Sequence, residues 1–314
     1  MGSRVVVLTG ASSGIGKAAA LAFAQRGDRL VLAARGAADL DAVAARCGGD
    51  PLAVPTDVAR ASDVDQLAAA AVDRFGRIDV WVDTAAVMAY GTFESLPPAV
   101  FERVVATDLL GPANVARAAL RQFRAQGAGT LILASSLLAH ITVPYMSAYA
   151  TAKWGMRGLA RTLRQETRNA PGIHVCTIAP GSVDTPIYTS AANYTGFVGR
   201  PPPPVDEPER IAEAIVRLAD RPKWETSIGA TNRIIQFGFA ALPLVYDALV
   251  GPLMRRGGLS REVAVPTAGN VFAPQHRLDG GSGRWSRAAV GAAAAGAAAA
   301  VTGAAALGLR LARR

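Results

Sequence analysis

Seven short segments, most of them apolar, alternate with longer Ala-rich amphipathic segments between residues 4 and about 230, and this alternation constrains the fold more than any other feature. The segments read RVVVLT, RLVLAA, PLAVP, RIDVWV, GTLILA, IHVCTI and WETSIG. Near-continuous apolar strands that alternate with helices are typical of a parallel sheet covered on both faces. We therefore expect residues 1–230 to form a single α/β domain, in which helices cover both faces of a doubly wound, seven-stranded parallel sheet.

A glycine-rich loop follows the first predicted strand. The sequence TGASSGIG places Gly10, Gly14 and Gly16 where the strand turns into the first helix. Glycine permits a tight turn and a close approach of the backbone to a pyrophosphate, whose charge the helix N-terminus stabilises. A purely structural turn is the competing interpretation, because the spacing is GxxxGxG rather than GxGxxG. The position after the first strand of an α/β pattern favours a Rossmann-type dinucleotide site.

Tyr149 and Lys153 lie four residues apart in a predicted helix, within SAYATAKWGM at residues 147–156. This spacing places both side chains on one helix face. A nearby ammonium favours the phenolate and lowers a tyrosine pKa from about 10 toward the working pH. Tyr149 would then act as a general acid in reduction and a general base in oxidation. An ordinary helix face is the competing interpretation.

Lysine is scarce in this chain, and that scarcity adds weight to Lys153. Among 33 basic residues only Lys17, Lys153 and Lys223 are lysines, and the remainder are arginines. Lysine carries a compact point charge with three donors on a flexible stem, unlike the planar guanidinium of arginine. The position of Lys153 is therefore expected to need an ammonium.

These motifs, in this order, resemble the classical short-chain dehydrogenase/reductase family. The likeness covers residues 4 to about 230 and rests on TGASSGIG, on YATAK, and on Ser136, which lies 13 residues before Tyr149. Asp57, after the third strand, matches the adenine-side aspartate of the family, and PGSVDT at residues 180–185 matches its nicotinamide-side motif. The resemblance implies an enzyme that interconverts a small-molecule ketone or aldehyde and an alcohol with a nicotinamide cofactor, and it implies a homo-oligomer.

The resemblance also implies roles for individual residues. Ser136 donates to the substrate oxygen, Tyr149 transfers the proton, and Lys153 holds the hydroxyls of the nicotinamide ribose. Ser135 is the neighbouring alternative to Ser136, but the spacing to Tyr149 matches the second serine. The implied cofactor-binding residues are Gly10, Ser12, Ser13, Gly14, Ile15, Gly16, Arg35, Asp57, Val58, Ala85, Tyr149, Lys153, Pro180, Gly181, Val183 and Thr185.

Arg35 ends the second predicted strand, in LAARG, where the adenosine ribose is expected. An acidic residue there accepts from the ribose 2′-hydroxyl and selects NAD, whereas an arginine pairs with a 2′-phosphate and selects NADP. The sequence therefore favours NADP over NAD. A solvated arginine in an arginine-rich chain is the competing interpretation.

Two positions depart from the family pattern. The usual NNAG after the fourth strand is DTAA here, residues 83–86, in which Asp83 and Thr84 keep hydrogen-bonding groups and Ala86 stays small. Asp108, in TDLLG, replaces an asparagine that in the family helps to hold a water beside the lysine. An aspartate can hold the same water, but its charge also attracts Lys153 and offsets the effect of the lysine on Tyr149. A tolerated polar exchange is the competing interpretation, so Asp108 is included among the catalytic candidates with Ser136, Tyr149 and Lys153.

The predicted substrate side is mostly apolar, which suggests a hydrophobic carbonyl or alcohol. The residues expected near the nicotinamide are Val87, Met88, Leu137, Leu138, Ile141, Val143, Tyr145, Met146, Ile187 and Tyr188. His140 is interpreted as an ordinary loop histidine in preference to a substrate contact. Residues 191–204, AANYTGFVGRPPPP, are interpreted as a mobile lid before a helix that begins near Glu207.

The C-terminal part differs in composition from the body. Residues 231–256 are expected to form an amphipathic helical extension broken near Pro243, and residues 257–287 a flexible linker rich in Gly, Ser, Pro and Arg. Residues 288–309 carry no charge and are long enough as a helix to cross a bilayer of about 30 Å. Their small Ala and Gly side chains make insertion marginal, so a membrane anchor and a disordered or loosely docked helix are the two interpretations.

Charge and cysteine usage limit the remaining classes. The net charge is +9, and most of it lies beyond residue 254, so the body is near neutral and nucleic-acid binding is not expected. The basic residues beside the apolar run fit a membrane surface better. Cys47 and Cys176 follow no metal-binding spacing, and the chain shows no secretory signal, so we expect no metal site and a cytoplasmic catalytic domain, tethered to a membrane if residues 288–309 insert.

Two other function classes compete with the oxidoreductase. A nucleotide-binding scaffold or sensor without turnover is suggested only by Asp83 and Asp108, and the full set of Ser136, Tyr149 and Lys153 opposes it. An epimerase or dehydratase of the extended relatives is opposed by the spacing of the glycine loop and by the lack of a larger C-terminal substrate domain.

Overall fold

A computed structural model describes residues 3–229 and 231–275 of the chain. Its centre is a seven-stranded parallel sheet, with the order β3-β2-β1-β4-β6-β7-β12 from one edge to the other. The predicted α/β fold is therefore confirmed, and each predicted strand is a member of this sheet: β1 (Val5–Thr9), β2 (Arg29–Ala34), β3 (Leu52–Pro55), β4 (Val80–Asp83), β6 (Gly129–Ala134), β7 (Ile173–Pro180) and β12 (Glu225–Ile228).

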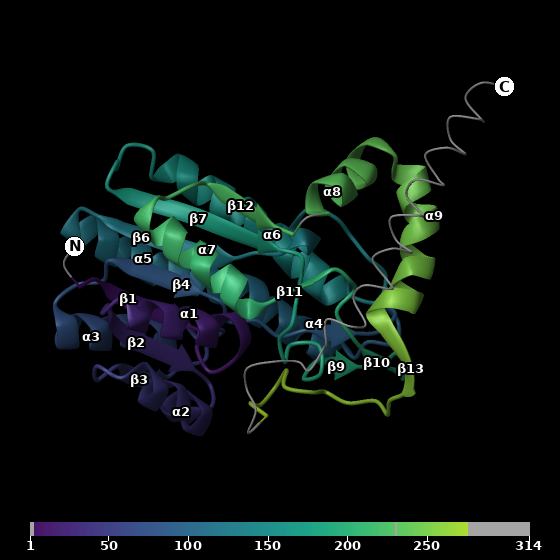
Figure 1. Cartoon of the computed structure of the whole chain (residues 1–314), viewed down its shortest axis with the longest axis horizontal. Coiled ribbons are helices and arrows are strands. Elements are labelled where there is room, and N and C mark those ends of the chain that lie inside the picture. The colour runs from purple at the N-terminus through teal and green to yellow at the C-terminus, as the bar shows by residue number, and fades with distance from the viewer. Residues whose placement is uncertain (1–2, 230, 276–314) are drawn as a thin grey trace.

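Helices cover both faces of the sheet (Figure 1). Successive strand residues point to opposite faces, so Leu8 of β1 packs under one helical layer and Val7 under the other. The first layer consists of α1 (Gly14–Gln25), α2 (Ala37–Cys47) and α7 (Pro208–Asp220). The second consists of α3 (Ala61–Phe75), α5 (Gly111–Gln126) and α6 (Ser147–Glu166).

The strand order reverses between β1 and β4. From β1 the chain builds outward through β2 to β3, and it then returns to place β4 on the other side of β1. The loops that leave the carboxyl ends of β1 and β4 consequently diverge toward opposite helical layers. In open α/β sheets this reversal leaves a crevice that is the usual ligand site.

Shorter elements lie beyond the carboxyl ends of the strands. They include α4 (Pro98–Val105), a π-helical turn at Ala106–Leu110 and a 3₁₀ turn at Leu137–Ala139. Three two-stranded pairs complete this region: β5 (Ala89–Tyr90) with β9 (Ala192–Asn193), β8 (Ser182–Val183) with β11 (Val205–Asp206), and β10 (Phe197–Gly199) with β13 (Leu259–Val263). Residues 191–204, predicted to be a lid, are thus tied to neighbouring segments through β9 and β10.

Two helices occupy the segment expected to be a helical extension. These are α8 (Asn232–Ala241) and α9 (Pro243–Leu253), which meet at Leu242, and they lie beyond one end of the sheet (Figure 1). The Tyr246 hydroxyl of α9 donates to the Thr142 carbonyl at 2.7 Å, and Val250 packs beside the apolar residues around Tyr149. The extension therefore contacts the region expected to hold the substrate.

Part of the predicted linker is structured. Residues 257–275 include β13 and a following segment that hydrogen-bonds to both Asn193 and Arg35, because its backbone groups find partners on the folded body. The rest of the predicted linker and the apolar run at 288–309 lie outside the described residues. Within residues 3–229 and 231–275, no helix is long and apolar enough to cross a membrane.

The packing of α6 against the π-helical turn at Ala106–Leu110 can be tested with two glycines of α6. Gly158 lies in the middle of the helix. It is exposed, and a Cβ added there would meet no atom within 4 Å. We expect Gly158→Ala to raise the free energy of unfolding by about 0.5–1 kcal/mol, because alanine reduces the conformational entropy of the unfolded chain. Urea unfolding followed by circular dichroism measures this.

Gly155 in the same helix is the matched control. A Cβ there would approach the Leu109 side chain at 2.9 Å, so Gly155→Ala should gain less or lose stability. Equal gains for the two variants, or a loss for Gly158→Ala, would contradict the packing of α6 against the π-helical turn.

Candidate active site

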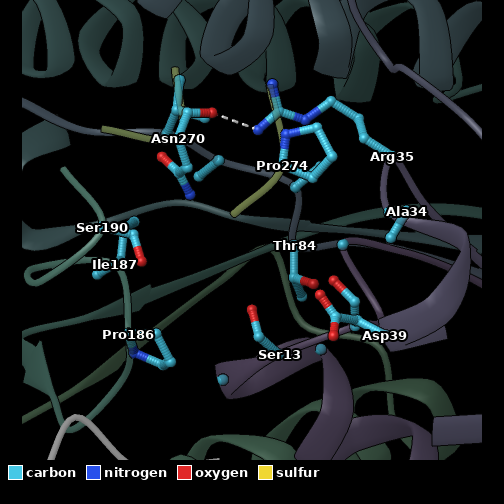
Figure 2. Close-up of a pocket in the computed structure, with 18 of the residues that line it drawn as sticks. Ser13, Ala34, Arg35, Asp39, Thr84, Pro186, Ile187, Ser190, Asn270 and Pro274 are labelled. Atoms are coloured by element: carbon cyan, nitrogen blue, oxygen red, sulfur yellow. Dashed lines mark hydrogen bonds between the residues drawn. The ribbon is translucent and has the colours of Figure 1, made fainter. Parts of the chain in front are cut away.

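A pocket opens at the crevice between β1 and β4 (Figure 2). It encloses about 190 Å³. Eleven of the sixteen predicted cofactor-binding residues line it, namely Gly10, Ser12, Ser13, Gly14, Ile15, Gly16, Arg35, Asp57, Val58, Ala85 and Thr185. The predicted glycine loop and the predicted adenosine and nicotinamide ends are therefore brought together around one cavity.

The glycine loop forms the floor of this pocket. Gly10 has a φ of +77°, and a Cβ there would lie 2.6 Å from the Ala85 backbone nitrogen, so only glycine lets the two loops touch. Ser13 stands at the N-cap of α1, yet its side chain makes no capping hydrogen bond. The first turn of α1 therefore presents its free N–H groups and the positive end of its dipole at the pocket, which suits a phosphate.

At the adenosine end, Arg35 is turned toward the C-terminal segment. Its Nη1 donates to the Val271 carbonyl at 3.0 Å and its Nη2 to the Asn270 carbonyl at 2.6 Å. Asp39, in the first turn of α2, lines the same end of the pocket. This end thus offers both a guanidinium and a carboxylate to a ribose.

Asp57 pairs with Arg103, which sequence reasoning did not identify. Arg103 Nη2 donates to Asp57 Oδ2, and the Ala59 N–H donates to Asp57 Oδ1 at 3.1 Å. Burial acts to raise the pKa of Asp57, but the hydrogen bonds from Arg103 and Ala59 outweigh it and lower that pKa. Asp57 therefore stays ionised and holds the loop after β3 in place.

Lys153 is buried beside two carboxyl groups. Its exposed fraction is 2%, its Nζ donates to the Ala134 carbonyl at 3.0 Å, and it lies 3.8 Å from Asp108 Oδ2. Asp83, whose Oδ1 accepts from the Thr9 hydroxyl at 2.6 Å, is also buried, and burial raises its pKa while the charge of Lys153 opposes that rise. Asp83 and Asp108, which depart from the family pattern, thus both lie within electrostatic reach of Lys153.

Asp108 is placed by the π-helical turn at the start of α5. Its Oδ1 accepts from the Val87 N–H at 2.9 Å, and among the described residues nothing donates to its buried Oδ2. Burial raises the pKa of Asp108 to about 7, although the ammonium of Lys153 opposes the rise. Extra residues in such π-helical turns often occur at functional sites.

The environment of Tyr149 raises its pKa above the ordinary value. Burial is the main cause and the charge of Asp108 the second, while a hydrogen bond from the Ser136 hydroxyl favours the phenolate. Lys153 Nζ lies 5.4 Å from the centre of the Tyr149 ring, and its charge is balanced by Asp108. The prediction that the pKa of Tyr149 is lowered is therefore wrong, because burial and the charge of Asp108 raise it.

Ser136 occupies the position that its spacing to Tyr149 predicts. It is the N-cap of the 3₁₀ turn at Leu137–Ala139, and its Oγ accepts from the Leu138 N–H at 3.1 Å. The same hydroxyl lies near enough to Tyr149 to act against the rise in its pKa.

Most of the predicted substrate-side residues form one apolar cluster around Tyr149. Leu137 and Ile141 are buried but lie outside this cluster. His140 lies 3.3 Å from Glu225 of β12, which agrees with an ordinary loop histidine. The members predicted from the sequence are Val87, Met88, Leu138, Val143, Tyr145, Met146, Ile187 and Tyr188, and the C-terminal part adds Val250, Met254, Leu259 and Val271.

Five predicted cofactor residues do not line the pocket: Tyr149, Lys153, Pro180, Gly181 and Val183. Pro180 ends β7, and Val183 pairs with Asp206 of β11, so this stretch directs the chain toward Thr185. Sequence reasoning missed several lining residues, among them Asp39, Thr56, Thr107, Ser190, Asn270, Pro274 and Gln275. Asp39 had a usable signal, since an acidic residue in the first turn after β2 lies near the expected ribose.

Comparison with known proteins agrees with this geometry. The family model described as short chain dehydrogenase matches residues 4–194. YxnA of Bacillus subtilis, an uncharacterised oxidoreductase, is 33% identical over 261 residues, which cover 80% of this chain and 72% of the relative.

Two solved structures share the fold. An alcohol dehydrogenase from the archaeon Thermococcus sibiricus, complexed with 5-hydroxy-NADP, has a TM-score of 0.64 and 29% identity and covers 72% of this chain and 96% of its own. A 3-ketoacyl-(acyl-carrier-protein) reductase from Brucella melitensis, complexed with NADH, has a TM-score of 0.64 and 26% identity with the same coverage. With its Rossmann-like sheet, its glycine loop and this match over more than half of its length, the chain belongs to the short-chain dehydrogenase family, whose members are oxidoreductases acting on CH–OH groups.

Proposed function

We propose that this protein is an NADP-dependent oxidoreductase that interconverts a carbonyl and an alcohol on a hydrophobic substrate, with Tyr149 as the general acid and base. The observation that carries this proposal is the placement of Tyr149, which is buried, has the Ser136 hydroxyl near enough to act on its pKa, and has Lys153 one helical turn away. Both side chains belong to rigid elements, which is what a proton transfer at a fixed point requires.

The pocket residues fit a nicotinamide dinucleotide. A pyrophosphate would fit at the floor of the pocket. There the N–H groups of the first turn of α1 receive no capping bond from the Ser13 side chain, and the backbone comes close at Gly10. A bound nicotinamide would supply or accept the hydride. Pro186, Ile187 and Ser190 line the pocket, and Ile187 also packs in the cluster that contains Tyr149, where the nicotinamide is expected.

The residues of the chain then have distinct tasks. In carbonyl reduction, Ser136 donates a hydrogen bond to the substrate oxygen and Tyr149 gives its proton to that oxygen, and in oxidation the two transfers run in reverse. The raised pKa keeps Tyr149 protonated at neutral pH, which suits the reductive direction. An oxidised nicotinamide is cationic and would lower that pKa when oxidation is required.

Arg35 supports NADP as the cofactor. It lies at the carboxyl end of β2, and Arg103 lies close enough to share the Val271 carbonyl with it, so two guanidinium groups gather at the adenosine end. Asp39 opposes them in charge, as does Asp57, which is already paired with Arg103. The solved relatives carry either an NADP derivative or NADH, so the choice rests on this local balance.

The apolar cluster around Tyr149 supports a hydrophobic substrate. Val250 and Met254 of the C-terminal extension pack with Leu138 and Tyr188 in the cluster that contains Tyr149. Apolar walls bury a hydrophobic substrate and exclude water from the hydride transfer.

The first test removes the acid. We expect Tyr149→Phe and Ser136→Ala each to lower kcat/KM by about 10²–10⁴-fold, because they delete the proton donor and its partner. A panel of carbonyls with NADPH and of alcohols with NADP, followed by absorbance, measures this. Ser135→Ala is the matched control and should retain activity. Undiminished turnover in Tyr149→Phe would refute the assigned role, and a wild-type protein that binds nucleotide without any turnover would favour the scaffold.

The second test concerns Asp108. Asp108→Asn removes a carboxylate that raises the pKa of Tyr149, so that pKa should fall. Alcohol oxidation needs the deprotonated tyrosine, so the rise of its kcat/KM with pH should occur at lower pH in Asp108→Asn. Carbonyl reduction needs the protonated tyrosine, so the fall of its kcat/KM with increasing pH should also begin at a lower pH in the variant.

Full pH profiles of kcat/KM in both directions measure this shift. We expect the activity of Asp108→Asn to be preserved or raised. A folded variant without activity would contradict the view that an amide can serve at this position, and an unmoved profile would contradict the electrostatic effect on Tyr149.

The third test concerns cofactor choice. We expect the unmodified chain to have a higher kcat/KM with NADPH than with NADH. Asp39→Asn removes negative charge beside the expected 2′-phosphate and should widen that preference by roughly three- to tenfold at low salt. Asp41→Asn, on the exposed side of the same helix, is the control. A preference for NADH, or one that Asp39→Asn leaves unchanged, would argue against a phosphate at this end.

A further inference from the structure

Residues 267–275, here termed the strap, cross the mouth of the pocket from one rim to the other. At the first rim, Thr267 and Asn193 exchange backbone hydrogen bonds of 3.0 and 2.8 Å, and the Asn270 N–H donates to the Ser190 carbonyl at 2.8 Å. At the second rim, Pro274 packs on Gly36, where an added Cβ would lie 3.3 Å from the proline Cβ. Asn270, Pro274 and Gln275 line the pocket between the two rims.

Two arginines hold the middle of the strap. Arg35 donates to the carbonyls of Asn270 and Val271, and Arg103 Nε donates to the Val271 carbonyl at 3.3 Å. Hydrogen bonds from charged donors are worth roughly twice those between neutral groups. These contacts therefore hold the strap against the end of β2 and against α4.

The carboxamide oxygen of Asn270 is buried without a hydrogen-bond donor among the described residues. Figure 2 shows Asn270 beside the Arg35 guanidinium and above Ser190, and all three residues line the pocket. Buried polar atoms nearly always have a hydrogen-bond partner, so an acceptor left open at the wall of a ligand pocket points to a donor on the ligand.

We propose that Asn270 is a cofactor-contacting residue whose carboxamide oxygen accepts a hydrogen bond from a ribose hydroxyl of the bound dinucleotide, and that Arg35 is the positioning residue that holds the strap there. This inference rests on the proposed dinucleotide cofactor. It gives Arg35 a task that does not depend on a 2′-phosphate. Asn270 therefore serves NADPH and NADH alike, whereas a phosphate contact serves only the first.

The size of the pocket indicates that the strap moves. The enclosed volume of about 190 Å³ is below the roughly 300–1,000 Å³ of ligand pockets in general. A dinucleotide that must reach from Gly36 to Tyr149 passes between the strap and the glycine loop. We infer that the strap lifts to admit the cofactor and closes again over it, with the contacts made by Arg35 broken and remade.

The first experiment measures dissociation constants of NADPH and NADH for the full chain by isothermal titration calorimetry. Asn270→Ala keeps the backbone carbonyl that Arg35 binds and removes only the carboxamide. We expect its dissociation constants for both dinucleotides to rise about tenfold, the value of one hydrogen bond of about 1.4 kcal/mol. Val265→Ala, whose side chain is 79% exposed just before the strap, is the control and should change neither constant. Unchanged binding in Asn270→Ala would overturn the contact.

The second experiment tests Arg35 through NADH, which has no 2′-phosphate. If Arg35 positions the strap, Arg35→Ala weakens NADH by about the same factor as Asn270→Ala, and the double variant is no weaker toward NADH than either single one. Hydrogen exchange of the unliganded chain should also rise at the amides of Asn270 and Val271. A loss confined to NADPH, with unaltered exchange in the strap, would overturn the positioning role.

Failure of the proposed cofactor and failure of the strap contact give different results. An unmodified chain that binds neither dinucleotide would refute the proposed cofactor, and the role of Asn270 with it. An unmodified chain that binds NADPH or NADH, and an Asn270→Ala variant that binds it equally well, would refute the strap contact alone. Protection of residues 267–275 from hydrogen exchange upon addition of NADPH or NADH is the expected positive result.

Discussion

The backbone contact between the glycine loop and the loop after β4 determines the geometry of the whole site. Gly10 lies so close to Ala85 that a Cβ would overlap the peptide between Thr84 and Ala85. The Thr84 hydroxyl donates to the Thr9 carbonyl at 2.8 Å and fastens the two strand ends together. The floor of the pocket is thus built from main chain, which leaves the N–H groups of α1 free. The sequence DTAA preserves this arrangement because Ala85 and Ala86 are small.

Around this floor the protein buries one ammonium and two carboxyl groups. A buried charge is tolerated only when it is paired or hydrogen-bonded, and Lys153 meets this condition through Asp108 and the Ala134 carbonyl. The pairing has a chemical consequence, because the charge of Asp108 raises the pKa of Tyr149 and so opposes the effect expected of the ammonium. An asparagine at position 108 would leave the ammonium freer to act on the phenol. Asp108 therefore favours the protonated form of Tyr149. The positive charge of an oxidised nicotinamide would then be a larger influence on the Tyr149 pKa than it would be with an asparagine at position 108.

Local sequence patterns were sufficient for the sheet and for much of the site. Five of the seven strand segments carry four or more apolar residues, whereas PLAVP and WETSIG carry fewer. The glycine loop and the Tyr149–Lys153 spacing are also local patterns that persist in three dimensions. The strap could not be predicted in this way. Arg35 and Val271 are 236 residues apart, and residues 257–275 carry the Gly and Pro content of a linker, so nothing local marks their docking. The raised pKa of Tyr149 could not be predicted from spacing either, because it depends first on the burial of Tyr149 and then on the charge of Asp108.

Val271 joins the two halves of the site. Its carbonyl is held by Arg35 and Arg103 at the adenosine end, while its side chain is fully buried in the apolar cluster that contains Tyr149. A strap that lifts to admit a dinucleotide therefore also withdraws part of the wall of the substrate side. A cofactor that favours the lowered strap restores that wall, and a hydrophobic substrate that packs on Val271 favours the lowered strap in turn. Because coupling between two binding sites is reciprocal, a strap that moves in this way would let the proposed cofactor and substrate each strengthen the binding of the other.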